Sequence, residues 1–398
     1  MAGDGPLPEI TILLPCLDEA ETLLACIREA QAALVAAGVE GEVLVADNGS
    51  RDGSPELAQA AQARVVVVAR RGYGSALLGG IAAARAPWVL MGDADGSYDF
   101  GELERFLAEL RRGADLVMGC RLPGGGGRIL PGAMPWPHRW LGNPVLSALG
   151  RLLFAVPVRD FHCGLRAFRR EAVLGLGLCC PGMEFASELV VKARLHGLVI
   201  REVPVTLRPD GRSRPPHLRS WRDGWRHLRL LLLLSPRWLF LVPGLCLALP
   251  SLLVFLRLWQ APLALGGLVL DTNTLIVAAA GLTAGVQVSL LGLLTRVLAV
   301  ELGLLPSGRM VERLRRLPAI ELGLALGGLL VLAGLGYLLL AVERWREAGF
   351  GPLSYPVSLR TVVPAVTAMA LGIQLAFSGC ALAVLSLGRE IRLRRADP

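Results

Sequence analysis

The sequence predicts an α/β domain with a mostly parallel sheet flanked by helices, followed by an amphipathic helix and four membrane-spanning helices. Three observations carry this prediction. Short apolar strands alternate with helical segments at the start of the chain, a segment rich in Arg and Trp follows, and four long apolar stretches come last. Alternation of strands and helices favours a parallel sheet, and about 20 apolar residues suffice to cross a bilayer.

The chain of 398 residues is apolar and poor in charge, with 53% hydrophobic and 19% charged residues. This composition rules out intrinsic disorder, and the eight cysteines lack the spacing of a disulfide framework. The net charge of +8 divides into −3 for residues 1–200, +5 for residues 201–229 and +6 for residues 230–398. Because the first half is slightly acidic, we expect no nucleic-acid partner.

Strands and helices alternate in order along the first half of the chain. We expect strands at 10–14, 42–46, 64–68, 88–92 and 115–119, and helices at 19–37, 54–63, 75–85 and 100–112. In open α/β sheets, ligands bind at the carboxyl ends of the strands. Polar side chains at those ends are therefore candidates for a binding site: Asp18, Glu19, Asp47, Asp52, Asp93, Asp95 and Arg121.

The segment Asp93-Ala94-Asp95 directly follows the strand expected at 88–92. Two carboxylates one residue apart can hold Mg²⁺ or Mn²⁺ together with the oxygens of a diphosphate. Alone the pattern is weak, because many loops carry two solvated acids. Its place after a buried strand favours the metal site.

Several other kinds of site are not found in the sequence. There is no GxxxxGK[ST] phosphate loop, and the glycines on either side of Tyr73 are followed by Leu77 where a dinucleotide-binding loop needs glycine. Cys179 and Cys180 are adjacent, which is not the spacing of a zinc site, and no GxSxG elbow of a serine hydrolase occurs. Lys192 is the single lysine, and we expect it on a solvated helix face.

Four apolar stretches are expected to span the membrane: residues 237–257, 274–295, 319–342 and 361–387. Arginines gather before the first stretch, between the second and third, and after the fourth, as is typical of cytoplasmic loops. We therefore expect an integral multi-pass protein of a prokaryotic-type cell membrane, with the first domain and both termini in the cytoplasm. Gly323 and Gly327 form a GxxxG pattern, which we expect to pack two helices closely.

Residues 217–234 are predicted to form an amphipathic helix in the headgroup region of the membrane. Leu and Trp recur there at three- and four-residue steps, with arginines beside them, a pattern typical of interfacial helices. A helix packed on a protein core is the alternative. The expected organisation is a cytoplasmic domain (1–215), a juxtamembrane helix (216–235) and a membrane domain (236–398).

Seven short motifs follow one another in the first half of the chain. They are PCLDE (15–19), DNGSRDGS (47–54), DAD (93–95), GCR (119–121), HRWLGN (138–143), DFHCGLR (160–166) and EVPV (202–205). As an ordered set they resemble the family 2 glycosyltransferases with a GT-A fold, and most of all the polyprenyl- and dolichyl-phosphate sugar transferases, such as dolichol-phosphate mannosyltransferase. The likeness covers about residues 9–220, and the four-span tail is similar only to some members.

The resemblance implies roles for individual residues. The donor nucleotide would be bound by Pro15, Leu17, Glu19, Asp47, Asp52 and Ala94. The metal would be held by Asp93 and Asp95, and the catalytic residues would be Asp95, Arg121 and Arg208. The acceptor phosphate would be bound by Arg139, Arg212, Ser213 and Arg214. The last three belong to residues 208–214, which look like the family's Arg-x-x-Gly-x-Ser-Lys loop.

Two positions depart from the family's pattern. Asp18 stands where Asn is usual, which leaves recognition of the nucleotide base open. Arg214 stands where Lys is usual, and this keeps the charge but changes the hydrogen-bond geometry.

The resemblance implies metal-dependent, inverting transfer of a single hexose to polyprenyl or dolichyl phosphate. The donor would be a nucleotide-sugar of the GDP-mannose or UDP-glucose type, and the reaction would take place at the cytoplasmic face of the membrane. Because a lipid monophosphate is already anionic, no general base is needed, and the demand falls on charge stabilisation by the metal and arginines. Two alternatives remain. One is a processive membrane polysaccharide synthase, although its Gln-x-x-Arg-Trp motif is not found, and the other is a non-enzymatic membrane scaffold.

Overall fold

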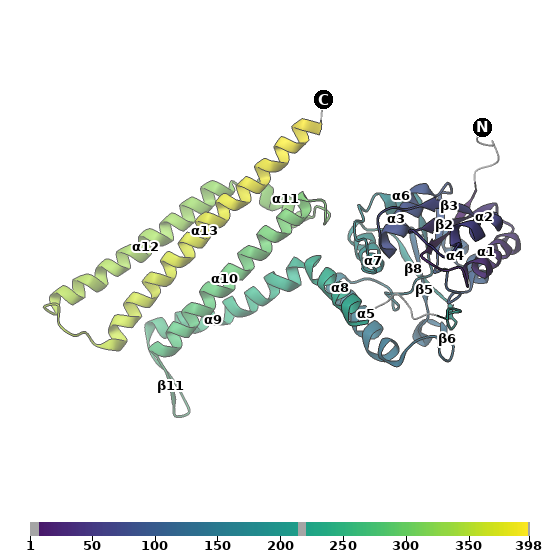
Figure 1. Cartoon of the computed structure of the whole chain (residues 1–398). Coiled ribbons are helices and arrows are strands. Elements are labelled where there is room, and N and C mark those ends of the chain that lie inside the picture. Colours follow the sequence, from purple (N-terminus) through teal and green to yellow (C-terminus); the bar gives the residue numbers. More distant parts are fainter. Residues whose placement is uncertain (1–7, 214–219, 397–398) are drawn as a thin grey trace. The chain divides into compact units, whose positions relative to one another are not determined.

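The computed structural model describes residues 8–213 and 220–396, and the chain divides into two compact units, Met1–Leu233 and Leu234–Pro398 (Figure 1). The division falls at the end of the predicted amphipathic helix, so this helix belongs to the first unit. The first unit is an α/β domain, and the second is built mainly of long helices.

Within the described residues, seven strands of the first unit form one sheet in the order β3-β2-β1-β4-β7-β5-β8. Their bounds are β1 Ile10–Cys16, β2 Gly41–Asp47, β3 Arg64–Val67, β4 Trp88–Met91, β5 Leu116–Cys120, β7 Arg166–Arg169 and β8 Ile200–Pro204. β7 runs antiparallel between β4 and β5, while the other neighbouring pairs are parallel. A further pair, β6 Arg128–Ile129 and β9 Thr206–Leu207, lies outside this sheet. The five predicted strands and the mostly parallel sheet are confirmed, and β7 and β8 are additional.

Helices cover both faces of this sheet. Their bounds are α1 Leu23–Ala37, α2 Ser54–Ala60, α3 Tyr73–Ala83, α4 Leu103–Arg111, α5 Asn143–Phe154, α6 Arg170–Leu174, α7 Phe185–Leu195 and α8 Ser220–Leu233. α1 and α4 share one buried apolar cluster with Ile10, Ile12 and Leu14, which alternate along β1 and so point to one face. α3 lies on the opposite face, where a Cβ on Gly80 would come within 2.3 Å of Leu13. Because β2 and β4 both pair parallel with β1, the carboxyl ends of these three strands lie at one edge of the sheet.

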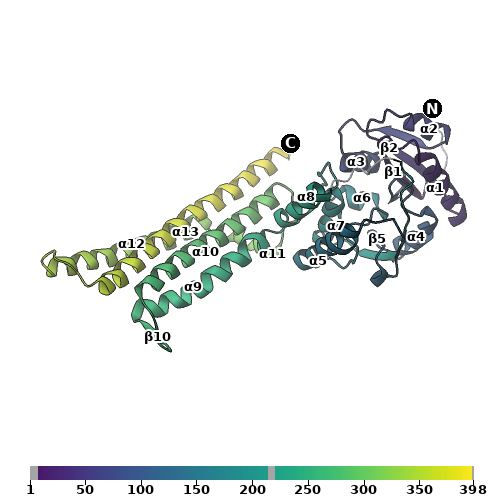
Figure 2. The same cartoon turned by 60° about the horizontal axis from the view of Figure 1, so that its bottom comes forward.

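α8 confirms the predicted helix over residues 220–233 and packs against α5 and α7 (Figure 2). Its inner side buries His227 and Leu231, and His227 Nδ1 lies 2.7 Å from Ser187 Oγ on α7. Burial lowers the pKa of His227 to about 4, so its ring is neutral at pH 7. Trp221 and Trp225 lie on the outer side and are 91% and 59% exposed. The predicted Trp stripe therefore faces away from the domain core.

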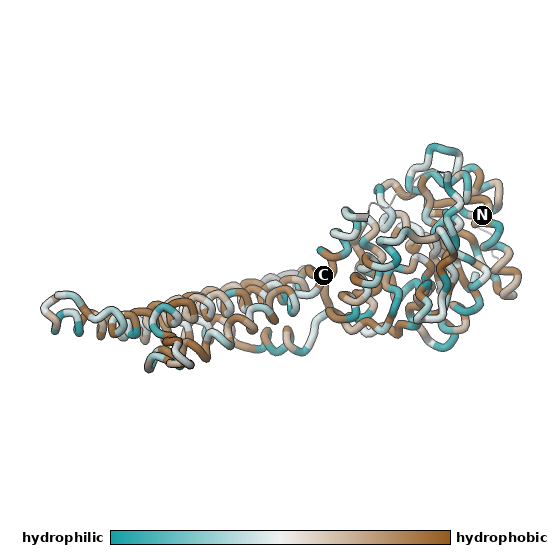
Figure 3. Tube along the Cα trace, turned by 90° about the horizontal axis from the view of Figure 1, so that it is seen from below, coloured by the Kyte–Doolittle hydropathy of each residue, from teal (hydrophilic) through white to brown (hydrophobic). Residues whose placement is uncertain are grey.

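The second unit contains the predicted membrane spans. Among the described residues, four helical stretches are long and apolar enough to cross a bilayer: Arg237–Gln260, Thr272–Glu301, Ala319–Glu347 and Tyr355–Leu387 (Figure 3). They comprise α9 Val242–Gln260 with the preceding turn Arg237–Leu241, α10 Thr272–Glu301, α12 Ala319–Glu347 and most of α13 Tyr355–Ala396. Shorter elements connect them: the hairpin β10 Leu263–Leu265 and β11 Leu268–Leu270, and helix α11 Arg309–Arg316. All four predicted stretches are confirmed by length and composition.

Glycines allow the long helices to approach one another closely. A Cβ on Gly323 of α12 would lie 2.9 Å from the Cα of Gly379 on α13, and one on Gly327 would lie 2.5 Å from the carbonyl oxygen of Gly372. No larger side chain fits at these crossings without moving the helices apart. The expected packing role of the GxxxG pattern is confirmed.

Candidate functional site

Two carboxylates hold together the loops that follow β1 and β2. Asp52 accepts a hydrogen bond from the backbone N–H of Ala20 at 2.8 Å, and Asp18 accepts one from the N–H of Arg51 at 2.7 Å. Asp18 has a φ of +57°, a left-handed conformation that Asp and Asn tolerate better than most residues. Asp can therefore stand in for the expected Asn at position 18, because it keeps both the conformation and the acceptor oxygen.

Asp47 ends β2 and is buried. Its carboxylate accepts the backbone N–H groups of Gly49 and Ser50 at 3.0 and 3.1 Å, which closes the turn after the strand. On the same edge of the sheet, Pro15 lies near the end of β1 and Leu17 directly follows this strand, and both are partly exposed. The predicted nucleotide-binding residues of the first two strands thus lie together at one edge.

Asp93 and Asp95 follow β4 at the same edge of the sheet. Tyr73, in the first turn of α3, donates its hydroxyl hydrogen to Asp93 Oδ1 at 2.9 Å. A Cβ on Gly164 would lie 2.7 Å from Asp93 Oδ2, so the backbone of residue 164 passes directly beside this carboxylate. Desolvation, and then repulsion from Asp95, raise the pKa of Asp93 to about 6. Two partly buried carboxylates that repel each other fit a hard divalent cation.

Arg212 lies against these acids. Its Nη2 is 2.8 Å from Asp95 Oδ2 and 3.0 Å from Asp210 Oδ2, while its Nη1 is 3.2 Å from Glu19 Oε1. The guanidinium of Arg212 neutralises the carboxylates of the predicted donor site. Its predicted contact with the acceptor phosphate stays a prediction.

The other residues of the 208–214 segment have different partners. Arg208 forms ion pairs with Glu29, at 3.1 Å, and with Asp99. Ser213 donates its backbone N–H to Glu21 Oε2 at 2.8 Å. Arg214 lies outside the described residues. The ion pairs of Arg208 place it in a cluster separate from the contacts that Arg212 makes, and its predicted catalytic role stays a prediction.

Arg121 follows β5 and is almost fully buried. Its guanidinium pairs with Asp160 through Nε at 2.7 Å and Nη2 at 2.8 Å, and its backbone N–H donates to the same carboxylate. Burial opposes the ionisation of Asp160, but the charge of Arg121 outweighs it and holds the pKa of Asp160 below its usual range. Arg121 thus fastens the segment that begins at Asp160, and its predicted catalytic role remains a prediction.

Arg139 lies in a single π-helical turn, His138–Gly142, that precedes α5. Its guanidinium carbon is 5.4 Å from the ring centre of Trp140, which is 64% exposed. A cation over an exposed aromatic ring gains about 0.5–1 kcal/mol. The predicted phosphate contact of Arg139 remains a prediction.

Sequence reasoning missed Tyr73 as a member of this site. A Cβ on Gly72, which has a φ of +129°, would lie 2.2 Å from the carbonyl oxygen of Pro181, and one on Gly74 would lie 2.2 Å from that of Cys180. The two glycines therefore let the start of α3 press against the segment before α7, with Tyr73 reaching the carboxylate pair. Glycines on either side of an aromatic residue were visible in the sequence, but their partners lie about 100 residues away.

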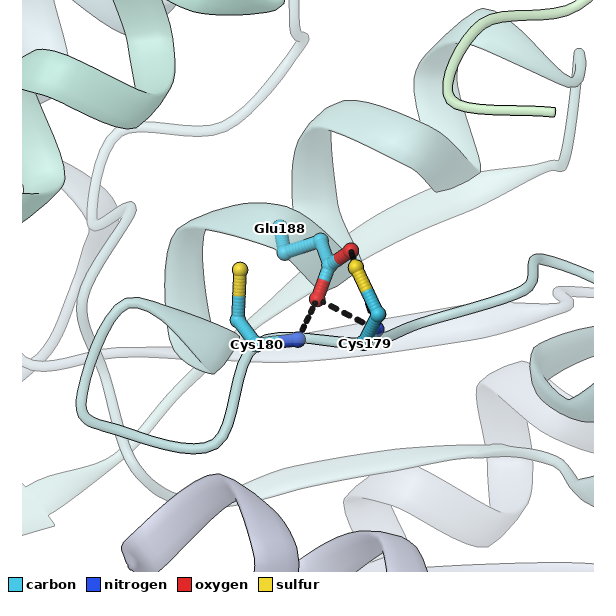
Figure 4. Close-up of side chains that lie close together, drawn as sticks. All are labelled: Cys179, Cys180 and Glu188. Carbon is cyan, nitrogen blue, oxygen red and sulfur yellow. Dashed lines mark hydrogen bonds between the residues drawn. The ribbon is translucent and has the colours of Figure 1, made fainter. Parts of the chain in front are cut away.

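Cys179, Cys180 and Glu188 lie together, with ligand atoms within 4.8 Å of one another (Figure 4). The oxygens of Glu188 already accept the backbone N–H groups of both cysteines, and Oε1 pairs with Lys192 Nζ at 2.8 Å. Because these contacts occupy the carboxylate, we interpret the cluster as a structural tie between α7 and the preceding segment. The expectation that Lys192 lies on a solvated face is wrong: it is 1% exposed and held by Glu188 and by the carbonyl of Gly177.

Comparison with known proteins decides the family. The family model of glycosyl transferase family 2 matches residues 11–176. The family model of the C-terminal transmembrane region of family 2 glycosyltransferases matches residues 293–386. The low-salt glycan biosynthesis hexosyltransferase Agl6 of Haloferax volcanii is 35% identical over 379 residues, which are 95% of this chain and 89% of that protein. The chain belongs to glycosyltransferase family 2. It is a glycosyltransferase and a membrane protein, and the predicted combination of a GT-A-type α/β domain with membrane helices is confirmed.

Other relatives of this family 2 glycosyltransferase carry more specific names. The dolichyl-phosphate hexose transferase of Haloferax volcanii is 32% identical over 167 residues, 42% of this chain and 70% of that protein. The polyprenol monophosphomannose synthase of Mycolicibacterium smegmatis is 33% identical over 216 residues, 50% of this chain and 78% of that protein. Among solved structures, glucosyl-3-phosphoglycerate synthase of Mycobacterium tuberculosis, with Mn²⁺ and UDP bound, is similar at 24% identity with a TM-score of 0.44, over 57% of this chain and 79% of that one.

Proposed function

We propose that this enzyme transfers a single hexose from a nucleotide-sugar, of the GDP-mannose or UDP-glucose type, to polyprenyl or dolichyl phosphate. The observation that carries the proposal is a carboxylate pair, Asp93 and Asp95, at the carboxyl edge of the sheet, in a chain whose described part also contains four helices of membrane-spanning length. The names of two relatives, a dolichyl-phosphate hexose transferase and a polyprenol monophosphomannose synthase, support the same lipid substrate class.

The donor site is proposed to lie along the ends of β1, β2 and β4. The nucleotide would rest against Pro15, Leu17, Glu19, Asp47, Asp52 and Ala94. Asp93 and Asp95 would hold Mg²⁺ or Mn²⁺, which when bound neutralises the departing nucleoside diphosphate. Asp93 has to be ionised for this, and Tyr73 favours the ionised form by donating a hydrogen bond to it.

The acceptor is proposed to arrive as an anionic lipid phosphate. An oxygen of that phosphate attacks the anomeric carbon from the side opposite the leaving diphosphate, so the new bond forms as the old one breaks and the configuration inverts. No side chain has to remove a proton from the nucleophile. Arg139, Ser213 and Arg214 are proposed to contact the acceptor phosphate, and Arg121 to maintain the segment 160–166 beside Asp93.

The membrane arrangement is also a proposal. The arginines before the first span, between the second and third, and after the fourth favour a cytoplasmic catalytic domain with both termini on the same side. The exposed Trp221 and Trp225 on α8 suit a helix that lies in the headgroup region. The proposed organisation along the chain is a domain of residues 1–215, this juxtamembrane helix (216–235) and a membrane domain of residues 236–398.

The test is an assay of the full-length chain in membranes with a panel of labelled nucleotide-sugars, polyprenyl phosphate and Mn²⁺ or Mg²⁺. One donor is expected to yield a labelled lipid, and Asp95→Ala is expected to abolish it. Glu109→Ala serves as the control, since Glu109 lies on α4 in a surface pair with Arg112. Labelled lipid formed at the normal rate by Asp95→Ala would refute the proposed site.

A further inference from the structure

The guanidinium of Arg212 supplies the positive charge among three carboxylates at the predicted metal site. Its side chain is about nine-tenths buried, and its two terminal nitrogens contact Asp95, Glu19 and Asp210 within 3.2 Å. The Asp95 oxygen that it contacts belongs to the same carboxylate pair that fits a divalent metal. A metal ion bound to this same oxygen would meet the charge of the guanidinium at close range. The two positive charges repel in a partly buried site, so binding of one weakens binding of the other.

The backbone holds Arg212 in this place. The N–H of Gly211 donates to the carbonyl of Asp95 at 2.8 Å, and the N–H of Arg208 donates to the carbonyl of Ser97 at 2.8 Å. The segment 208–213 is therefore paired with the loop that carries Asp95. Asp210, 3.0 Å from Nη2, belongs to the same segment as Arg212, so the guanidinium can turn away from Asp95 and keep this partner.

We propose that Arg212 and the divalent metal are alternative occupants of one site. Before the donor binds, Arg212 neutralises Asp95 and Glu19. When the metal arrives with a nucleoside diphosphate, the guanidinium leaves Asp95 and binds the diphosphate, whose oxygens offer it the paired acceptors that Arg prefers. This inference rests on the proposed function, and it adds that the metal binds well only together with the donor.

The first test measures the affinity of the purified full-length chain for Mn²⁺ alone, by electron paramagnetic resonance. Arg212→Gln is expected to bind Mn²⁺ at least tenfold more tightly than the unchanged chain, because the competing cation is gone. Arg212→Lys, which keeps the charge, is expected to stay within about threefold of the unchanged chain. Arg112→Gln is the matched control, since it removes one exposed arginine, the partner of Glu109 at the end of α4, and is expected to change nothing. Equal or weaker Mn²⁺ binding by Arg212→Gln would overturn the proposal.

A second variant keeps the test decisive if Arg212→Gln does not fold. Arg212→Met keeps the aliphatic length of the side chain, removes its charge and leaves Asp95 and Asp210 intact. It is expected to tighten Mn²⁺ binding at least tenfold, and unchanged affinity would overturn the proposal.

A third measurement concerns the coupling between metal and nucleotide. Saturating UDP or GDP is expected to raise the Mn²⁺ affinity of the unchanged chain by a larger factor than that of Arg212→Gln. In the unchanged chain the diphosphate draws Arg212 away from Asp95 and so frees the metal site, whereas the variant has no guanidinium to move. The same factor in both proteins would refute the exchange. These outcomes do not depend on sugar transfer. If Arg212 and Mn²⁺ compete as proposed but no labelled lipid forms, only the proposed function is refuted.

Discussion

Arg121 donates two hydrogen bonds to the carboxylate of Asp160, from Nε to Oδ2 at 2.7 Å and from Nη2 to Oδ1 at 2.8 Å. The pair joins the end of β5 to the segment 160–166, and four residues further along this segment Gly164 passes beside Asp93. A buried ion pair therefore positions the backbone that borders the carboxylate site. Removal of one partner is expected to destabilise the fold, because the remaining charge stays buried without an opposite charge beside it.

Asp160→Ala should lower the free energy of unfolding by about 3–5 kcal/mol, since it leaves the guanidinium of Arg121 buried without its partner. Thermal unfolding of the detergent-solubilised chain measures this. Glu109→Ala, which removes a surface partner of Arg112, should change stability by less than about 1 kcal/mol. Equal melting temperatures for Asp160→Ala and the unchanged chain would contradict the structural role.

Mn²⁺ binding should weaken as the pH falls below about 6, because Asp93, whose pKa is raised to about 6, must lose its proton to bind a cation. Titration with Mn²⁺ between pH 5 and pH 8 measures the effect. Asp93→Asn should bind weakly and with little dependence on pH in this range. A flat profile for the unchanged chain would show that Asp93 is not the group that titrates.

The same group should make the metal-free protein less stable as the pH rises. The pKa of Asp93 is about 6 in the folded state and about 3.9 in the unfolded state. Between these values the folded state holds a proton that the unfolded state has released, so the stabilisation is complete at low pH and is lost as the pH passes 6. The loss is at most about 3 kcal/mol. A melting temperature that Asp93→Asn leaves equally dependent on pH would refute this assignment.

Tyr73→Phe should move the midpoint of Mn²⁺ binding to higher pH, because the lost hydrogen bond had favoured the ionised form of Asp93. A hydrogen bond to a charged group contributes about 1.5–3 kcal/mol, so turnover should fall about tenfold or more. The fold should remain, since the ring of the new residue fills the same space. An unshifted midpoint would mean that the hydroxyl does not act on Asp93.

Lys192→Met should destabilise the chain strongly, because it leaves the buried carboxylate of Glu188 without its 2.8 Å partner. The double variant Lys192→Met with Glu188→Gln should recover part of the loss, since both charges are then absent. Melting temperatures of the two single variants and the double variant measure the interaction by a double-mutant cycle. Strictly additive losses would show that the two charges do not interact.

Much of the fold was predictable because its pattern is local. The apolar runs of β1, β2, β4 and β5 and the long apolar stretches of the second unit are each visible within 30 residues. β7 was not predictable, since two of the four residues in its sequence Arg-Ala-Phe-Arg are charged. Arg166 is nevertheless buried, and it donates hydrogen bonds to the carbonyl oxygens of Cys163, Ala186 and Phe161.

The site was predictable in its positions but not in its contacts. Acids at strand ends must converge on one edge of a parallel sheet, so Asp47 and Asp93 could be placed from the strands alone. The pairing of Arg212 with Asp95 joins residues 117 positions apart, and no local pattern reveals it. Glu188 and Lys192 have the four-residue spacing of an exposed helix pair, and only the packing of α7 shows that they are buried.

The most direct test of the central claim is the mass of the lipid product. The full-length chain in membranes, given polyprenyl phosphate, Mn²⁺ and the nucleotide-sugar that it uses, is predicted to form a lipid heavier than the acceptor by one hexose unit. Mass spectrometry of the extracted lipid gives this number. A ladder of products with many sugar units would contradict the account in favour of a polysaccharide synthase, and no product with any nucleotide-sugar would contradict it in favour of a scaffold.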